Sequence, residues 1–296
     1  ITARRAGLSV ALIDKARFPR DKLCGGLITG RCAAHLWDIF GLDVDADRLF
    51  ERREVFEFYM DGQCLARMEE VPPAWLTMRR AFDADLLQRA LRAGALDLTG
   101  ERVQELDLER NTLTLGSGKR LTYKALIGAD GVQSVVARAL FGESFEAAKI
   151  GFALEVEAPG DHPSPATPIR VDFAAASWGY GWSFPKENST TIGIGGLKTR
   201  NPDMKAALAG YRGLLGDGSE VKIKGHHLPF GGYRNRPGQG NVLLAGDAAG
   251  FVDPITGEGL GHAIHSGALA AQAVAEAIEA GQPAGALARY RIATRP

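Results

Sequence analysis

The sequence predicts an α/β fold in which the two ends of the chain build a mostly parallel sheet and the middle inserts an antiparallel sheet. Apolar runs at residues 8–14 and 121–131 reach an acidic residue near their ends, which is typical of buried parallel strands whose carboxyl ends face a crevice. Alternating, aromatic-rich runs between residues 150 and 197 favour antiparallel strands. The segment NVLLAGD (241–247) then returns to the parallel-strand pattern.

These changes of pattern divide the chain into two expected domains. The ranges are residues 1–148 with 235–296 for the first domain, and residues 149–234 for the inserted sheet, with strands from 52–78 as candidates to join it. FDADLLQRALRAGA (82–95) is predicted to be a helix, because its apolar residues recur every three or four positions and Gly94 can end it. A second helix is expected near residues 202–215, inside the inserted part.

Composition excludes several classes of function. Lys plus Arg and Asp plus Glu both total 35, so the net charge of zero argues against a nucleic-acid partner. Asp247 interrupts the longest apolar run, which excludes a membrane span but leaves peripheral membrane contact open. The cysteines, Cys24, Cys32 and Cys64, are too few and too irregularly spaced for a disulfide framework or a zinc site. A cytoplasmic location fits this cysteine content best.

The first residues resemble the end of a helix followed by a strand. ITARRAG is basic and closes with Gly7, and we expect a strand and a glycine-rich phosphate turn about 20 residues upstream of the next strand end. That strand, LSVALID (8–14), ends at Asp14, followed by Lys15. In dinucleotide-binding folds an acid here binds the adenosine ribose hydroxyls, so both residues are cofactor-binding candidates. The alternative is an acid in a solvated turn.

The segment GDAAGFVDPITGEGLGHAIHSG (246–267) combines a strand-end acid with a glycine-rich helix start. The carboxylate can accept a hydrogen bond from a sugar-alcohol hydroxyl, and the exposed backbone amides with the helix dipole would stabilise negative charge on the N1–C2=O edge of a reduced flavin. The cofactor-binding candidates of this segment are Gly246, Asp247, Pro254, Gly257, Gly259 and Leu260.

Together with GADGVQSVVAR (128–138), this segment resembles the flavoprotein oxidoreductases of the p-hydroxybenzoate hydroxylase fold. The resemblance implies a Rossmann-like FAD-binding domain with an inserted antiparallel-sheet substrate domain, and it assigns Asp247 to the FAD ribityl chain. It also implies that the second segment supports the cofactor and substrate sites. The matching residues of that segment are Asp130, Gly131, Ser134 and Arg138.

A narrower resemblance rests on FPRDKLCGGL (18–27) and YGWSFPK (180–186). Both are similar to signatures of the geranylgeranyl reductase family. The resemblance implies an FAD enzyme that reduces carbon–carbon double bonds of an isoprenoid, a small hydrophobic substrate, with electrons from NAD(P)H or another donor. The candidate residues are Cys24, Gly25, Tyr180 and Trp182 for catalysis, Lys22, Cys24, Gly25 and Gly26 for the cofactor, and Tyr180, Trp182 and Phe184 for the substrate.

Each of these assignments has a structural alternative. Cys24 can be a proton relay or a cysteine in a tight turn. The three aromatic residues alternate, so they share one face of a strand, either as the wall of an apolar tunnel or as a sheet core against helix 202–215. Arg79 resembles the arginine that these flavoproteins place near the flavin, with Arg80 as its solvated neighbour.

Two functional alternatives remain at this point. One is a flavin-dependent aromatic monooxygenase or halogenase of the same fold, although the halogenase Trp-x-Trp-x-Ile-Pro segment matches YGWSFPK only in outline. The other is a non-catalytic flavin-binding homologue. A metal site is not expected, because His262 and His265 lie three residues apart without a third ligand. The glycines of TIGIGGLK (191–198) lie in a strand pattern rather than in a phosphate loop.

Overall fold

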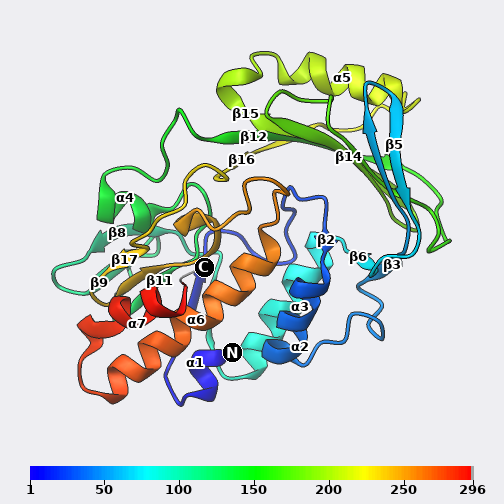
Figure 1. The fold of residues 1–296 in the computed structure, drawn as a ribbon. Helices are drawn as coiled ribbons and strands as arrows, with labels where there is room; N and C mark the ends of the chain where they lie inside the picture. The colour runs from blue at the N-terminus through cyan, green and yellow to red at the C-terminus, as the bar shows by residue number, and fades with distance from the viewer. Residues whose placement is uncertain (295–296) are drawn as a thin grey trace.

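The largest element of the computed structural model, which describes residues 1–294, is a seven-stranded sheet that arches over the rest of the chain (Figure 1). Its strands, in spatial order, are β16 (Lys224–Leu228), β12 (Gly151–Pro159), β15 (Ser189–Leu197), β14 (Gly179–Pro185), β13 (Ile169–Asp172), β4 (Phe56–Met60) and β5 (Gln63–Met68).

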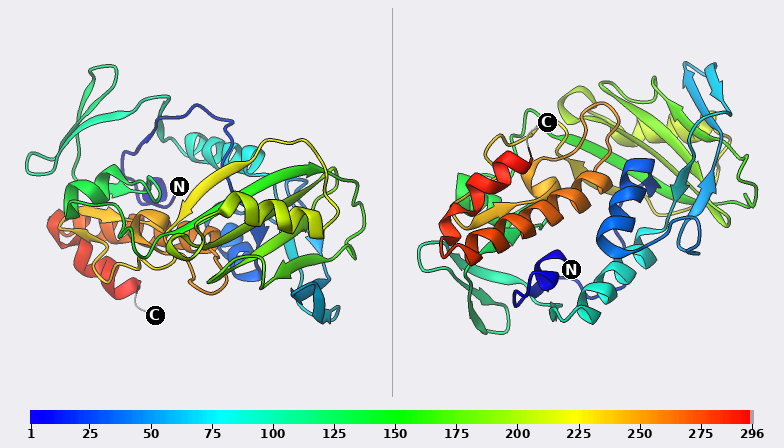
Figure 2. Two further views of the ribbon diagram at one scale, coloured as in Figure 1. Left: turned by 90° about the horizontal axis from the view of Figure 1, so that it is seen from above. Right: turned by 60° about the horizontal axis from the view of Figure 1, so that its bottom comes forward.

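The outer face of this sheet is covered by α5 (Met204–Leu214), as Figures 1 and 2 show. Leu154 and Ile194 of the sheet pack there against Leu208 of the helix. All neighbouring strands are antiparallel except β13 and β4, which pair in parallel. The expectation of a purely antiparallel insertion was therefore wrong at this one pair, because β4 comes from an early part of the chain and joins β13 without a hairpin.

The predicted parallel strands occur in two smaller sheets. β1 (Ala11–Asp14) pairs in parallel with β7 (Leu96–Thr99), and β11 (Leu126–Gly128) pairs in parallel with β18 (Val242–Leu244). The edge strand β17 (Gly238–Gln239) runs antiparallel to β18. β18 is fully buried, whereas no residue of β1 is, because β1 is hydrogen-bonded on one edge in a two-stranded sheet. The buried pattern predicted from the sequence is therefore only partly realised in β1, which pairs with β7 alone among residues 1–294.

Two small sheets and the remaining helices complete the fold. The sheets are β8 (Val103–Asp107), β9 (Thr112–Leu115) and β10 (Arg120–Thr122), and β2 (Leu27–Ile28), β3 (Glu51–Arg53) and β6 (Ala74–Leu76). The helices are α1 (Thr2–Arg5), α2 (Gly30–Phe40), α3 (Arg79–Arg92), α4 (Val135–Phe141), α6 (Leu260–Glu279) and α7 (Ala286–Ala293), with 3₁₀ turns η1 (Lys198–Arg200), η2 (Gly246–Ala249) and η3 (Pro283–Gly285).

Two expected elements differ in their bounds. The apolar run 121–131 is not one strand but belongs to β10 and β11 in different sheets, because the Tyr123 amide bonds to Asn111 while the Leu126 amide bonds to Asn241. The helix expected at 82–95 is α3, which begins at Arg79 after an extended Met78 and is followed by Gly94 with a φ of 92°.

The core beneath the parallel strands holds β18 and α6 in a fixed relation. Leu243 and Leu244 of β18 are completely buried among residues of α6 and α7. The buried Tyr290 hydroxyl of α7 donates a hydrogen bond of 2.9 Å to the Leu244 carbonyl oxygen. This packing fixes the point at which the chain leaves β18 and enters the Gly246–Asp247 turn.

Candidate functional site

The Cys24–Gly26 turn lies between β1 and β2 and is held tightly against the end of β6. The Gly26 amide donates to the Cys24 Sγ atom at 3.4 Å, and the Thr77 amide donates to the Gly26 carbonyl oxygen at 2.9 Å. Gly26 has a φ of 80°, and a Cβ atom at this position would lie less than 3.0 Å from the Thr77 carbonyl oxygen. Only glycine meets both conditions without strain.

Tyr180, Trp182 and Phe184 lie along β14 as a continuous aromatic row, as their alternation predicted. Successive ring centroids are 6.0 and 6.4 Å apart. The row packs with Leu76 and Ile169 on the face of the sheet opposite α5. The interpretation of this row as a core against helix 202–215 was therefore wrong, because the parity of β14 turns it toward the body of the molecule.

The aromatic row meets the Cys24 turn directly. A Cβ atom on Gly25 would lie 2.6 Å from the Phe184 ring and 3.4 Å from the Trp182 Nε1 atom. The glycine therefore lets the backbone of the turn lie flat on the two rings. Trp182 is only 7% exposed, and its Nε1 atom has no hydrogen-bond partner among residues 1–294.

Tyr180 connects this row to the third segment singled out in the sequence. Its hydroxyl donates a hydrogen bond to the Thr256 carbonyl oxygen, next to Gly257 in the turn before α6. Burial is the main cause that raises the pKa of Tyr180 to about 12, and the nearby Asp253 carboxylate adds to it. The phenol therefore keeps its proton at neutral pH and remains a donor. Three sequence segments that are far apart in the chain thus converge here.

Arg79 lies under the same turn, and Arg80 does not. The Arg79 guanidinium forms two hydrogen bonds with Asp83, of 2.7 and 2.9 Å. Burial lowers the pKa of Arg79, but the neighbouring Cys24 and Asp83 raise it by more, so the charge is retained. Arg80 is exposed and only approaches Asp21, at 3.7 Å. The structure therefore distinguishes the buried arginine from its solvated neighbour.

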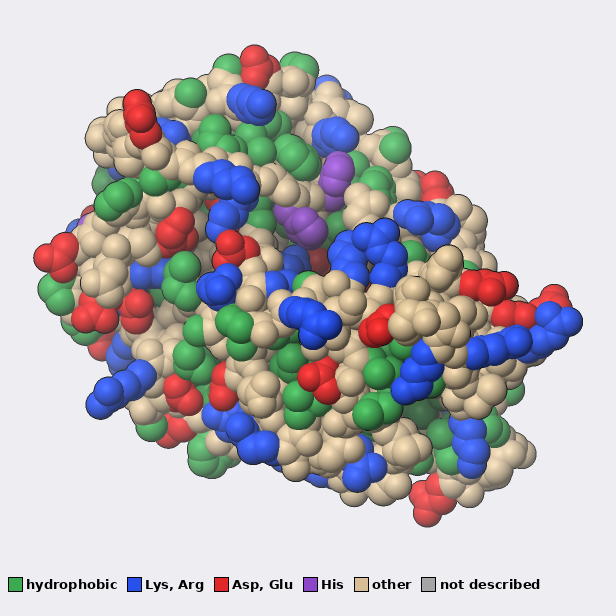
Figure 3. Space-filling model, turned by 180° about the vertical axis from the view of Figure 1, so that it is seen from behind, with side chains coloured by type: hydrophobic (Ala, Val, Ile, Leu, Met, Phe, Trp, Pro, Cys, Tyr) green, Lys and Arg blue, Asp and Glu red, His purple; other side chains and the backbone are tan. Residues whose placement is uncertain are grey.

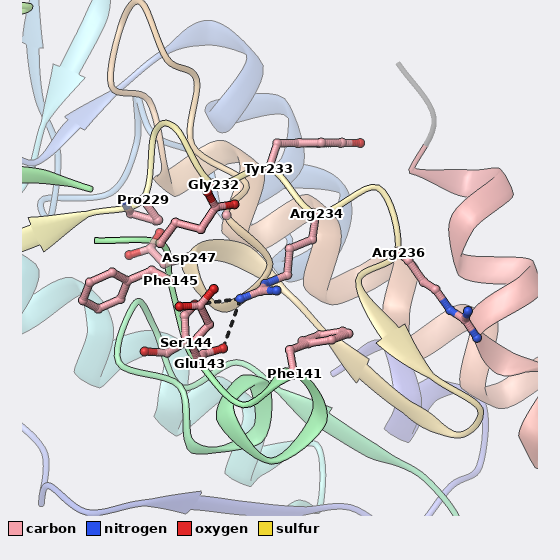
Figure 4. Close-up of a pocket in the computed structure, with 12 residues that line it drawn as sticks. Phe141, Glu143, Ser144, Phe145, Pro229, Gly232, Tyr233, Arg234, Arg236 and Asp247 are labelled. Atoms are coloured by element: carbon pink, nitrogen blue, oxygen red, sulfur yellow. Dashed lines mark hydrogen bonds between the residues drawn. The ribbon is translucent and has the colours of Figure 1, made fainter. Parts of the chain in front are cut away.

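Asp247 lines a pocket of about 300 Å³ between η2 and the segment after α4 (Figure 4). Arg234 crosses this pocket, donating to the Ser144 and Glu143 carbonyl oxygens at 2.9 and 3.3 Å. The Asp247 carboxylate accepts no hydrogen bond from the described part of the chain, and a Cβ atom on Gly259 would lie 3.6 Å from its Oδ1 atom. The carboxylate is therefore available to a ligand beside the first turn of α6.

The cofactor candidates Lys22 and Lys15 both lie near His226. Lys22 donates to the His226 Nε2 atom at 3.3 Å. Burial lowers the pKa of His226 to about 4, and the positive charges of Lys22, Arg79 and Lys15 add to this effect. Figure 3 shows Lys and Arg side chains gathered with histidines near the middle of one face of the molecule.

The remaining candidates have local roles within the chain. The Asp14 carboxylate accepts a hydrogen bond of 2.8 Å from the Ala16 amide at the end of β1. Asp130 accepts a hydrogen bond of 2.7 Å from the Val135 amide in the first turn of α4, whose N-cap is Ser134. Gly131 has a φ of 76° with open space around it. Pro254 lies in the exposed turn before α6, and Leu260 is its first helical residue.

One histidine of α6, His265, packs against another helix. The His265 ring stacks on His35 of α2, with centroids 4.2 Å apart. Within residues 1–294, no group of three His, Cys, Asp or Glu side chains is arranged to hold a metal ion. In the same part of the chain, every helix is too short or too polar to cross a bilayer.

Comparison with known proteins adds to this geometry. The family model for tryptophan halogenases matches residues 57–289. The menaquinone reductase of Mycobacterium tuberculosis is 30% identical over 308 residues, covering 91% of this chain and 71% of that protein. The chain belongs to the superfamily of FAD-dependent oxidoreductases that contains the geranylgeranyl reductases and the flavin-dependent halogenases.

A second sequence relative and a solved structure are also similar to this chain. Digeranylgeranylglycerophospholipid reductase 1 of Methanococcoides burtonii is 31% identical over 304 residues, covering 94% of this chain and 71% of that protein. The crystal structure of a geranylgeranyl bacteriochlorophyll reductase-like protein from Thermoplasma acidophilum matches with a TM-score of 0.85 at 23% identity, covering 98% of this chain and 78% of that one. The mixed α/β FAD-binding fold expected from the sequence is confirmed.

The fold family binds FAD, and residues of this chain have the chemistry to hold it. Asp247 offers a free carboxylate, which suits a ribityl hydroxyl. α6 begins at Leu260 without a side-chain cap, so the amides of its first turn are open to a negatively charged group. These are the donor and acceptor types that the polar part of a flavin requires.

Sequence reasoning missed one polar residue of this site, Glu155 of β12. It is buried, and its Oε1 atom accepts a hydrogen bond of 3.0 Å from the Cys24 amide. The signal in the sequence was a pair of acids, Glu155 and Glu157, on one face of the otherwise apolar strand GFALEVEA. Such a buried acid calls for a partner or a function.

Proposed function

We propose that this protein is an FAD-dependent reductase of carbon–carbon double bonds in an isoprenoid chain, using electrons from NAD(P)H or another donor. The observation that carries the proposal is the contact between the Cys24–Gly26 turn and the aromatic row, together with the Tyr180 hydrogen bond to the turn before α6. This arrangement brings an apolar wall, a thiol and the flavin-binding segment to one place. A prenyl alkene needs such a wall, because it has no polar group to orient it.

The residues divide this work by their chemistry. Asp247 would bind the ribityl chain, and the amides at Gly259 and Leu260 would stabilise the N1–C2=O edge. The Gly257 amide, also a candidate from the sequence, instead donates a hydrogen bond of 3.0 Å to the Asp253 carbonyl oxygen. Bound FAD supplies the hydride chemistry. Arg79 would hold the Cys24 turn in a positive field, and Asp14, Lys15, Lys22, Asp130 and Gly131 are proposed as outer contributors to the cofactor site.

Trp182 and Phe184 would form the wall along which the isoprenoid lies. The surrounding side chains are apolar and partly buried: Leu23, Leu27, Phe56 and Leu228. We propose that residues 149–234, with strands from 52–78, form the substrate domain, and that residues 1–148 and 235–296 form the FAD domain. A cytoplasmic protein in peripheral contact with a membrane would meet such substrates where they reside.

The names of two relatives support a reductase function. Reductases of menaquinone and of digeranylgeranylglycerophospholipid are among the proteins to which this chain is similar, and both names denote prenylated lipids. The match to the tryptophan halogenase family model supports a second candidate, a flavin-dependent halogenase or aromatic monooxygenase. In that case the reduced flavin would react with oxygen instead of an alkene. A non-catalytic flavin-binding protein is the third outcome of the test below.

The test follows the fate of reduced flavin. The flavin-loaded protein is reduced under anaerobic conditions and mixed with a series of polyprenyl substrates of different length, and flavin reoxidation and product mass are measured. We expect reoxidation without oxygen and a product that has gained two hydrogens. Reoxidation that requires oxygen, with an oxygenated or halogenated product, would favour the second candidate, and no product under either condition would favour the third.

A matched pair of variants tests the role of the aromatic row. Trp182→Ala opens the proposed wall, whereas Trp37→Ala removes an indole that is 60% exposed on α2. We expect the first variant to change the relative turnover of short and long prenyl chains while flavin content stays the same. The second variant should change neither quantity. An unchanged chain-length profile in Trp182→Ala would show that the row is only core.

A further inference from the structure

Trp182, Gly193 and Glu155 form one row across three adjacent strands of the large sheet. Gly193 of β15 is directly opposite Trp182 of β14 on one side and directly opposite Glu155 of β12 on the other. A Cβ atom on Gly193 would lie less than 3.0 Å from the Trp182 ring. The indole therefore lies over β15 where the glycine leaves space, and Glu155 continues the row on the same face.

The Cys24–Gly25 turn covers this row. The Cys24 amide donates to the Glu155 Oε1 atom at 3.0 Å, and Gly25 lies next to the Trp182 Nε1 atom. Glu155 is only 5% exposed, and its Oε2 atom has no hydrogen-bond partner among the described residues. One carboxyl oxygen thus fixes the backbone of the turn, while the other is buried and free to carry a proton or to bind a ligand.

Charged groups face Glu155 from three sides. Lys186, which follows β14, is 2% exposed and contacts Glu157 at 3.3 Å. Lys224 of β16 is directly opposite Glu155. Burial is the main cause that raises the pKa of Glu155 to about 7, and Glu157 adds to it, while the Cys24 amide, Lys186 and Lys224 act in the opposite direction.

A lysine–histidine pair also lies beside this turn. His226 follows Lys224 on β16 by two residues, so both point to the same face of the strand, and the Lys22 ammonium donates to His226. Because burial lowers the pKa of His226 to about 4, this imidazole is neutral at pH 7. It therefore does not supply a compensating positive charge for Glu155 in the neutral range.

We infer that Glu155 is a positioning residue that holds the Cys24 turn through its backbone amide and controls the charge of the turn by gaining or losing a proton. In its protonated form it leaves the Cys24 thiol facing the positively charged Arg79 without an added negative charge from β12. In its ionised form it repels a thiolate and any other negative charge that develops at the turn. The role of Cys24 in this inference rests on the proposed function, but the charge control does not.

The test measures thiol reactivity and needs neither substrate nor flavin turnover. In a Cys64→Ser background, Cys24 is the accessible thiol, because Cys32 is buried and burial raises its pKa to about 12. Glu155→Gln keeps the oxygen that accepts the Cys24 amide but cannot ionise. We expect iodoacetamide to alkylate Cys24 about tenfold faster at pH 8 in Glu155→Gln than in the parent, and equally fast at pH 5.

A second carboxylate, far from the Cys24 turn, provides the control for the alkylation experiment. Glu105→Gln removes an exposed carboxylate on β8, in a different sheet, and should leave alkylation unchanged at both pH values. Equal alkylation rates at pH 8 in Glu155→Gln and Glu105→Gln would overturn the inference. Glu155→Asp, which keeps the charge but shortens the reach, should resemble the parent at pH 8 rather than the glutamine variant.

A direct titration keeps the inference testable if the variant fails to fold. Carbon-13 labelling of glutamate side chains in the parent protein should reveal one carboxyl group that titrates near neutral pH, and its absence would contradict the inference. Neither measurement depends on alkene reduction. A protein that reduces no alkene but shows the expected alkylation difference would overturn the proposed function alone, whereas an active reductase with equal alkylation rates would overturn the role of Glu155 alone.

Discussion

The loss of stability expected on replacing Gly26 by alanine can be derived by comparing it with Gly118, a glycine of nearly equal backbone conformation. Gly26 has a φ of 80° and Gly118 has a φ of 83°, but only Gly26 faces a neighbour, the Thr77 carbonyl oxygen, while Gly118 has open space. Replacement by alanine costs about 1–2 kcal/mol at both positions for the left-handed conformation. At Gly26 the displaced backbone adds a further cost of about 1–3 kcal/mol.

Urea unfolding followed by circular dichroism compares the two variants under one set of conditions. We expect Gly118→Ala to lower the free energy of unfolding by about 1–2 kcal/mol and Gly26→Ala to lower it by about 2–5 kcal/mol. Gly26→Ala should also reduce flavin content, because the Cys24 turn is displaced from the aromatic row. Equal losses of stability in the two variants would refute the claim that the turn is clamped against β6.

Two other predictions concern charge at the site. Asp247→Ala should weaken FAD retention by about 1.5–3 kcal/mol, because a charged hydrogen-bond acceptor is lost, and equilibrium flavin titration measures the change; unaltered affinity in a folded variant would remove the ribityl assignment. Glu155 has its pKa raised from 4.5 to about 7 in the folded chain, so its contribution to stability is complete below pH 4.5 and is lost as the pH rises through 7. Unfolding measured from pH 4.5 to 8 should show a loss on the order of 3 kcal/mol that Glu155→Gln lacks, and parallel curves for the two proteins would contradict it.

Local patterns predicted the backbone geometry of the candidate segments, because each motif carries its own geometry. The alternation of Tyr180, Trp182 and Phe184 places three rings on one face whatever the rest of the sheet does. The change from an apolar strand to Gly246 and Asp247 marks a strand end, and the glycine-rich stretch that follows marks the start of α6. These features depend on neighbours close in sequence, so a single sequence is enough to indicate them.

Long-range features were beyond the reach of those patterns. The parallel pairing of β4 with β13 joins segments more than a hundred residues apart, and nothing in either strand specifies the other. The role of Glu155 likewise depends on the Cys24 amide, on the opposite side of the site. The choice between tunnel wall and helix-facing core for Trp182 required knowing which side of the sheet α5 covers.

The glycines of β15 limit which substitutions the aromatic row can accept. Gly193 and Gly195 lie beneath the Trp182 indole, and a Cβ atom on Gly195 would already approach the ring to 3.3 Å. Because these two positions of β15 have no side chains, the strand leaves room for the indole to lie directly on its backbone. Bulk added at position 193 would tilt the indole toward Gly25, so the sizes of residues 182 and 193 are coupled and a change at one is tolerated only with a change at the other.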